Sequence, residues 1–75
     1  MRELVEYLVS SLIGGDKEFD VSINEEERTI YVHVDKEDIG KVIGRAGKIA
    51  KAIRVIVKAA ATKVNKRYNV EIIER

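Results

Sequence analysis

The sequence predicts a two-layer α+β domain in which helices cover one face of a three-stranded mixed sheet. Apolar residues recur at helical spacing in three segments and alternate with polar residues in three others. These segments follow one another in the order α-β-β-α-α-β. A chain of 75 residues is one domain, near the lower size limit for folding without disulfides. We expect a single domain over residues 1–75, with a core unit at 28–75 preceded by a helix and a strand at 1–24.

The first segment, residues 2–13, has the pattern of an amphipathic helix. Leucines recur every four residues, and Val5, Val9 and Ile13 form a second series beside them. Two glycines follow at once, and glycine adopts the conformation that ends a helix at little cost. We expect the apolar stripe of this helix to be buried, and we place Tyr7 in the core.

Two strands are predicted at residues 19–24 and 29–34, where apolar and polar residues alternate. The short acidic turn between them, at Glu25–Glu27, predicts an antiparallel hairpin. Tyr31 and His33 then lie on the outer face of the sheet, where we expect them to be solvated.

The second half of the chain is predicted to contain two helices and a last strand. Asp35 is a suitable N-cap for a short helix at about residues 36–43. The glycines at 44–47 separate it from a long helix that runs to about residue 64, and alternation at 68–72 predicts the last strand. Because two helices separate the second strand from the third, these strands can pair in parallel through a right-handed crossover.

The charged residues are distributed unevenly, although the net charge is only +1. Residues 1–38 contain 4 basic and 11 acidic side chains, whereas residues 39–70 contain 9 basic side chains and no acid. The nine cations are Lys41, Arg45, Lys48, Lys51, Arg54, Lys58, Lys63, Lys66 and Arg67. Long basic side chains can simply solvate a helix, but this imbalance favours a surface that binds a polyanion.

The Gly44–Gly47 turn between the two predicted helices is the part of the chain best suited to bind an anion. Because glycine has no Cβ, the backbone of such a turn can approach a ligand closely. The N–H groups at the start of the next helix can bind an anion, and the surrounding Arg and Lys residues favour phosphate. A Walker-type phosphate loop is excluded, because its pattern needs glycine at Val42 and Ser or Thr at Ile49.

This turn, with V-I before it and K-I-A-K-A-I after it, resembles the I-G-x-x-G loop of the KH domain, which clamps about four nucleotides by their backbone. The helix and strand at the N-terminus resemble the type II arrangement. Nearly the whole chain, from R-E-L-V-E-Y-L-V to K-A-A-A-T-K, is similar to the KhpA family of small bacterial RNA-binding proteins. These are stand-alone KH domains.

The resemblance implies a function, a location and partners. It implies a cytoplasmic protein that binds single-stranded RNA and acts as an RNA chaperone or post-transcriptional regulator. It also implies self-association as a homodimer, and pairing with a larger multidomain KH-containing protein of the Jag type.

The resemblance further assigns RNA contacts to four groups of residues. The clamp consists of Gly44, Arg45, Ala46 and Gly47. The phosphate path consists of Lys41, Lys48, Lys51 and Arg54, with Lys66 and Arg67 as a second wall. The apolar residues Ile39, Ile43 and Ile49 either form a floor for bases or pack in the core, and both interpretations stay open. Ile53 and Val57 are assigned to the core.

The sequence lacks the residues that an enzyme active site or a calcium-binding loop requires. The single histidine, His33, has no nucleophile or orienting carboxylate at a diagnostic spacing. The acidic turn at Glu25–Glu27 lacks the spaced ligands of a calcium loop. We therefore expect no enzymatic activity, no cofactor and no metal. The absence of cysteine fits a reducing cytoplasm, and no apolar run approaches the roughly 20 residues that span a bilayer, so we expect no membrane partner.

Two alternatives stay open. In the first, the protein is an interaction or dimerisation module whose working surface is the alanine-rich face of the long helix, around Ala59–Ala61, and nucleic-acid binding is incidental. In the second, the ligand is single-stranded DNA, because nothing in the sequence identifies a contact to a 2′-hydroxyl group.

Overall fold

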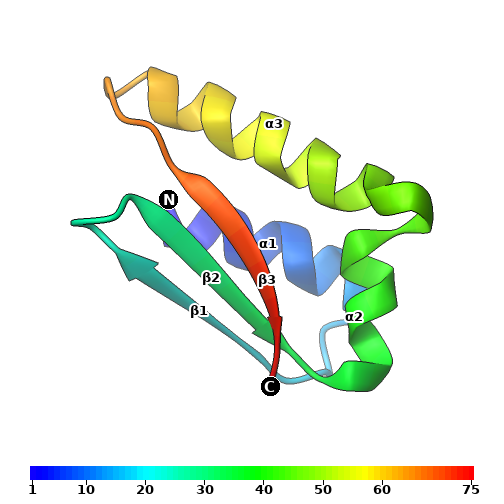
Figure 1. Ribbon diagram of the computed structural model, residues 1–75. Helices are drawn as coiled ribbons and strands as arrows, with labels where there is room; N and C mark the ends of the chain where they lie inside the picture. The colour runs from blue at the N-terminus through cyan, green and yellow to red at the C-terminus, as the bar shows by residue number, and fades with distance from the viewer.

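The computed structural model describes residues 1–75 and confirms the predicted fold class and order of elements (Figure 1). The helices are α1 (Arg2–Ile13), α2 (Lys36–Ile43) and α3 (Lys48–Thr62), and a 3-10 turn, η1 (Arg45–Gly47), joins α2 to α3. The strands are β1 (Phe19–Asn24), β2 (Thr29–Val34) and β3 (Asn69–Glu74). No helix of this fold combines the length and the apolar character that a membrane span requires.

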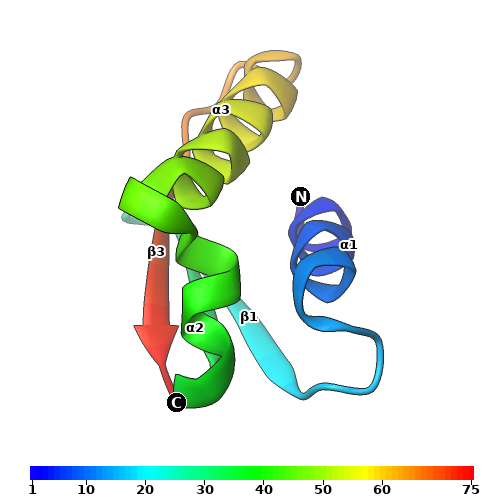
Figure 2. The ribbon, with the colours of Figure 1, turned by 90° about the vertical axis from the view of Figure 1, so that its right-hand side faces the viewer.

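The strand β2 lies at the centre of the sheet. It pairs antiparallel with β1, where Val21 is opposite Val32, and parallel with β3, where Ile30 is opposite Val70. The parallel pair is connected through α2 and α3, as predicted from the two helices between these strands. In Figure 2, α3 lies over β3, whereas α1 lies on the side of β1. The three helices also contact one another, so they cover the same face of the sheet.

The hydrophobic core is formed by the inward face of the sheet and one stripe of each helix. Its 13 buried residues are Val5, Val9, Ile13, Val21, Ile30, Val32, Val34, Val42, Ile53, Val57, Ala61, Tyr68 and Val70. Full burial of a Val or Ile side chain stabilises the fold by about 1.5–3 kcal/mol. The alternating residues of the strands and the helical stripes are therefore what holds the two layers together.

Tyr7 lies outside this core, and its predicted burial was wrong. Its side chain is 70% exposed. Val5, Val9 and Ile13 form the buried stripe of α1. Because each residue of an α-helix is rotated by about 100° from the one before, Tyr7 points roughly 200° away from Val5 and reaches solvent.

An arginine from a helix reaches each outer edge of the sheet. The guanidinium group of Arg2 donates a hydrogen bond to the Val21 carbonyl in β1. On the opposite edge, Nε of Arg54 donates to the Val70 carbonyl in β3 at 3.3 Å. An uncovered edge presents free backbone groups to other chains. These two contacts occupy part of each edge and fix α1 and α3 relative to the sheet.

Candidate nucleic-acid interface

The turn between α2 and α3 contains three residues with positive φ: 74° at Gly44, 56° at Ala46 and 74° at Gly47. The Gly44 N–H donates to the Gly40 carbonyl at 2.8 Å, and the Gly47 N–H donates to the Gly44 carbonyl at 3.2 Å and closes the turn. Arg45 and Ala46 are the first two residues of η1, no side chain caps this turn, and the N–H groups at the start of a helical segment have no acceptor within it. Two backbone donors are thus free at the tip of the turn, as an anion-binding turn requires.

Gly44 is required by close packing as well as by its backbone conformation. A Cβ atom at this position would lie 2.6 Å from Cγ1 of Ile49 and 2.9 Å from its Cβ. At Gly47 a Cβ would meet no atom within 4 Å, so there only the positive φ favours glycine. The side chain of Ile49 therefore lies directly against the turn and supports its shape.

The apolar residues near the turn differ in how much surface they expose. Ile43, the last residue of α2, is 36% exposed. Ile39 and Ile49 are half-buried and pack against the core. Ile53 and Val57 are fully inside, as predicted. Among the three residues whose role the sequence left open, Ile43 presents the most apolar surface beside the turn.

A row of cations continues from the turn along one side of α3. Lys51, Arg54 and Lys58 are separated by three and four residues, so they lie on the same side of the helix. Arg54 shows which side this is, because it reaches the Val70 carbonyl on the outer edge of β3. We call Lys51, Arg54 and Lys58 the basic flank of α3.

The cations of the turn and of the basic flank have no carboxylate partner. The five ion pairs of the molecule, with N–O distances of 3.5–3.9 Å, are all made by Lys17, Lys41 or Arg75. Arg45, Lys48 and the basic flank are exposed and unpaired. Their charge is therefore available to an anionic ligand.

Lys41 differs from the other residues of the predicted phosphate path. Its Nζ lies 3.6 Å from Oδ1 of Asp38, whose side chain is only 1% exposed. The second oxygen of Asp38 is buried and has no hydrogen-bond partner. Lys41 itself is 53% exposed, but it already serves as the counter-ion of a buried acid. A phosphate would have to share this lysine with Asp38.

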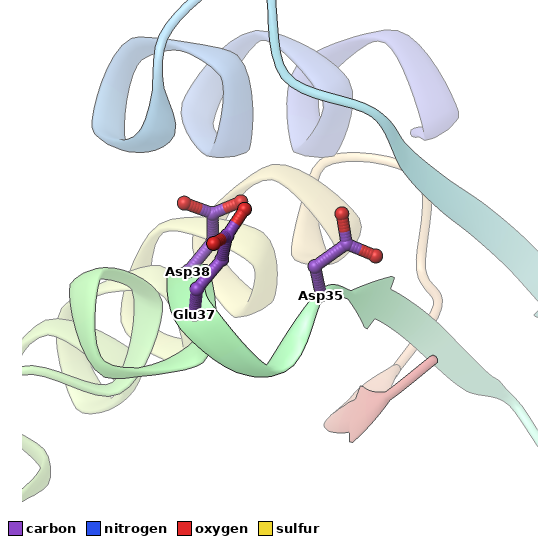
Figure 3. A group of neighbouring side chains, drawn as sticks. All are labelled: Asp35, Glu37 and Asp38. Atoms are coloured by element: carbon purple, nitrogen blue, oxygen red, sulfur yellow. The ribbon is translucent and has the colours of Figure 1, made fainter.

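Three carboxylates gather at the start of α2 (Figure 3). Oxygens of Asp35, Glu37 and Asp38 lie within 4.8 Å of one another. Asp35 lies 3.5 Å from Arg75 and Glu37 lies 3.5 Å from Lys17, while Asp38 has the lysine described above. The charges of Asp38 and Glu37 raise the pKa of Lys17. Each acid is thus neutralised by a cation of the protein, and we interpret the group as a structural contact that fixes the start of α2.

A hollow of about 280 Å³ lies at the far end of the basic flank, where the chain passes from α3 to β3. It is lined by Lys58, Thr62, Lys66, Arg67, Tyr68 and Asn69, and we call it the end hollow. Lys66 and Arg67, predicted as a second wall, line it together with Lys58. The sequence-based prediction of the site did not include Lys58, although its spacing of four residues from Arg54 could have indicated it.

Tyr68 separates the end hollow from a second, more apolar hollow on the side of α1. Its hydroxyl group donates a hydrogen bond to Oε1 of Glu25 at 2.5 Å. This bond raises the pKa of Tyr68 and lowers the pKa of Glu25. Arg28 lies over its ring, 5.8 Å from the centre. Tyr68 is 5% exposed, so it supports both hollows and offers no face for stacking on a base.

The outer edge of β3 forms the wall opposite the basic flank. The Asn69 N–H donates to the Arg28 carbonyl, on the β2 side. Because alternate residues of a strand point their backbone groups to opposite edges, the N–H and C=O groups of Val70 and Ile72 point away from β2. The Val70 carbonyl accepts the hydrogen bond from Nε of Arg54. The sequence has no signal for this wall, because the order of strands decides which edge of β3 stays open.

The basic flank of α3 and the outer edge of β3 run side by side (Figures 1 and 2), and we call the strip of surface along them the groove between α3 and β3. The free N–H groups of the turn stand at one end and the end hollow at the other. The basic flank and the edge of β3 form the sides. Such a groove can hold an extended polyanion and offers hydrogen bonds beside the charged contacts.

Known proteins are similar to this chain over nearly its whole length. A family model described as KhpA/KhpB, KH domain, matches residues 2–72. A protein of Clostridium perfringens named RNA-binding protein KhpA is 53% identical, over 97% of this chain and 100% of the relative. Proteins of the same name from Clostridium acetobutylicum and Listeria monocytogenes are 49% and 45% identical, over 97% and 99% of this chain and 100% of each relative.

No solved structure matches the chain significantly. The family model alone covers every helix, β1, β2 and most of β3. The turn between α2 and α3 lies inside the matched residues. The chain therefore belongs to the KhpA/KhpB family of KH domains.

Proposed function

We propose that this protein binds single-stranded RNA in the groove between α3 and β3. The observation that carries this proposal is the set of unpaired cations beside two free backbone N–H groups at the tip of the turn. One phosphate is held by the N–H groups of Arg45 and Ala46, with the Arg45 and Lys48 side chains beside it. Further phosphates follow the basic flank. The names of the relatives support RNA as the ligand.

The bases of the RNA lie on the other side of its sugar-phosphate backbone, where Ile43 and the outer edge of β3 contact them. Ile43 offers an apolar contact next to the turn. The N–H and C=O groups of Ile72 on the outer edge of β3 are free to form hydrogen bonds with a base edge. Phosphate contacts fix the position of a nucleic acid and do not read its sequence. We therefore expect weak sequence preference, set mainly by the few contacts along β3.

In the cell, we propose that the protein works in the cytoplasm as an RNA chaperone or post-transcriptional regulator. The family and the names of the relatives support a role in RNA metabolism. A single small site has limited contact area, so we expect a dissociation constant near micromolar, or about −8 kcal/mol. A second site brought by a partner would raise the effective affinity.

We also propose self-association through the side of α3 that faces α1. Ile56 is 41% exposed, Ala59 is exposed and Ala60 is half-buried. These three residues, spaced three and one apart, form what we call the apolar flank of α3. Ala61 is fully buried in the core, so only two members of the predicted alanine cluster reach the surface. The apolar flank is also the surface that we propose for a larger KH-containing partner of the Jag type.

The RNA clamp is tested by replacing Arg45 and Ala46 together with Asp. Both side chains are exposed, and Asp adopts the left-handed conformation of position 46 more readily than Ala does. We therefore expect the fold to survive with a change in unfolding free energy within about 1 kcal/mol. The variant places acids where a phosphate must bind, so RNA affinity should fall at least about tenfold, which needs only about 1.4 kcal/mol. Fluorescence anisotropy measures the affinity, and circular dichroism checks the fold.

The matched control makes the same change in charge away from the groove. Lys36→Asp with Gly15→Asp is suitable, because Lys36 is exposed at the start of α2 and a side chain on Gly15 would meet no atom within 4 Å. This control should bind RNA within about twofold of the unmodified protein. Normal RNA binding by the folded R45D/A46D variant would overturn the clamp and favour an interaction module in which RNA binding is incidental. Equal affinity for DNA and RNA oligomers of one sequence would contradict selectivity for RNA.

A further inference from the structure

We propose that the end hollow is a second phosphate site, which holds the RNA backbone several nucleotides away from the turn. This inference rests on the proposed function and extends it. It predicts that the protein contacts more nucleotides than a KH loop clamps, which is about four. RNA of that minimal length would then use only part of the binding surface.

The distance between the two sites follows from the length of α3. The turn precedes Lys48, and Lys58 and Thr62 are the residues of α3 that line the end hollow, 10 and 14 residues further along the helix. At about 1.5 Å per residue, the two sites are roughly 15 to 21 Å apart. A phosphate in the end hollow cannot therefore be a neighbour of the phosphate at the turn. Several nucleotides must lie between them, beside the basic flank.

The chemistry of the end hollow suits a phosphate diester. Three of its six lining residues are cations, Lys58, Lys66 and Arg67, and none is an acid. None of these cations takes part in an ion pair. The hydroxyl group of Thr62 donates to the Lys58 carbonyl at 2.8 Å, so the charged contacts are left to the three cations. Arginine and lysine are the usual donors to phosphate oxygens in proteins.

The end hollow is continuous with the site at the turn. Lys58 belongs both to its lining and to the basic flank, one helical turn beyond Arg54. Asn69, the first residue of β3, lies on its other side. An RNA strand that leaves the turn and follows the groove between α3 and β3 therefore reaches the end hollow without crossing an acidic side chain of α3.

The test is a length series with labelled oligouridylates from about four to about ten nucleotides, measured by fluorescence anisotropy. The unmodified protein should bind the long oligomers at least about tenfold more tightly than the four-nucleotide one. The variant K66Q/R67Q, at two cations that line the end hollow and lie outside the basic flank, should lose this gain and bind the shortest oligomer within about twofold of the unmodified protein. We also expect a change in the slope of log affinity against log salt concentration, measured on long oligomers. In the variant this slope should be smaller in magnitude by about 0.7 for each phosphate that is no longer neutralised.

The control K63Q/K36Q removes the same charge at two exposed lysines that do not line the end hollow. It should keep the full gain with length, including the part that arises from more binding registers on a longer strand. A gain that K66Q/R67Q retains, or that the control also loses, would overturn the second site. The proposed function fails separately, if R45D/A46D binds every length as the unmodified protein does. Melting curves of all variants establish that each is folded.

Discussion

The two flanks of α3 belong to one helix but suit different ligands. The basic flank carries cations without acid partners, faces the edge of β3 and leads into the end hollow. The apolar flank faces α1, where Ala60 and Val64 line a hollow together with Met1 and Leu4. One side is suited to a polyanion and the other to an apolar protein surface.

The buried stripe between the flanks explains why one helix can carry both. Ala50, Ile53, Val57 and Ala61 face the sheet and hold α3 in place. Because the α-helix has 3.6 residues per turn, a stripe of this kind leaves one flank on each side, and the flanks point away from each other. RNA binding and self-association should therefore be separable by mutation. The predictions below test this separation, from the largest expected effect to the smallest.

The largest effect is expected from Arg54→Glu on the basic flank. This change removes a cation from the groove and adds an anion. At about 4 Å and an effective dielectric constant near 20, two like charges repel by roughly 4 kcal/mol. We expect RNA affinity to fall at least about tenfold by fluorescence anisotropy, while the dimer measured by sedimentation persists.

The comparison for this variant is Lys63→Glu. Lys63 directly follows α3, is exposed and does not line the end hollow, so the change in charge is matched. Its RNA affinity should stay within about twofold of the unmodified protein. Arg54→Lys adds a second control, because it keeps the charge and removes the Nε contact with β3. Equal losses in R54E and K63E would mean that net charge alone, and no particular groove, attracts RNA.

A smaller effect is expected from Ala59→Glu on the apolar flank. Ala59 is exposed, so the fold should tolerate the change, but a charge at a contact between two copies is costly. We expect the dissociation constant of the dimer to rise at least about tenfold by sedimentation. Binding of a short RNA should stay within about twofold. Ser22→Glu, an exposed position on the outer face of the sheet, is the control and should leave the dimer intact. A monomeric unmodified protein at tens of micromolar would remove this surface from the proposal.

The smallest effect is expected from Tyr68→Phe, at the boundary between the two hollows. The variant loses the hydrogen bond to Glu25, so its melting temperature should fall by a few degrees at neutral pH, with RNA affinity nearly unchanged. The pKa of Glu25 is lowered from 4.5 by this bond. Its contribution to stability is therefore present above about pH 4.5 and is lost as the pH falls through the lower pKa of the folded state.

The difference in melting temperature between Y68F and the unmodified protein should accordingly shrink as the pH falls below 4.5. Glu25→Gln is the control, because it removes the titrating group. In that background, Tyr68→Phe should give a difference that does not depend on pH in this range. A difference that stays constant in the unmodified background would show that the bond to Glu25 does not stabilise the fold.

Much of the fold was predictable because its signals are local. The spacing of Val5, Val9 and Ile13 predicts a buried helical stripe, and the alternation around Val32 predicts a strand whose inward side is known. The turn at Gly44–Gly47 was predicted from the same kind of local signal, since glycine itself indicates an unusual backbone conformation. The predicted burial of Tyr7 was wrong because Tyr7 lies on the opposite side of α1 from the stripe of Val5, Val9 and Ile13.

The sequence by itself determined the order of elements, the parallel crossover and the family, since each depends on residue types and spacings along the chain. Only the tertiary structure decided which surfaces meet. It placed Ile49 against Gly44, paired Lys41 with the buried Asp38, and brought Lys58 next to Arg67 in the end hollow. It also decided that the outer edge of β3 faces the basic flank. These contacts join residues from separate elements, so they depend on how the layers pack, and spacing within one helix or strand carries no information about them.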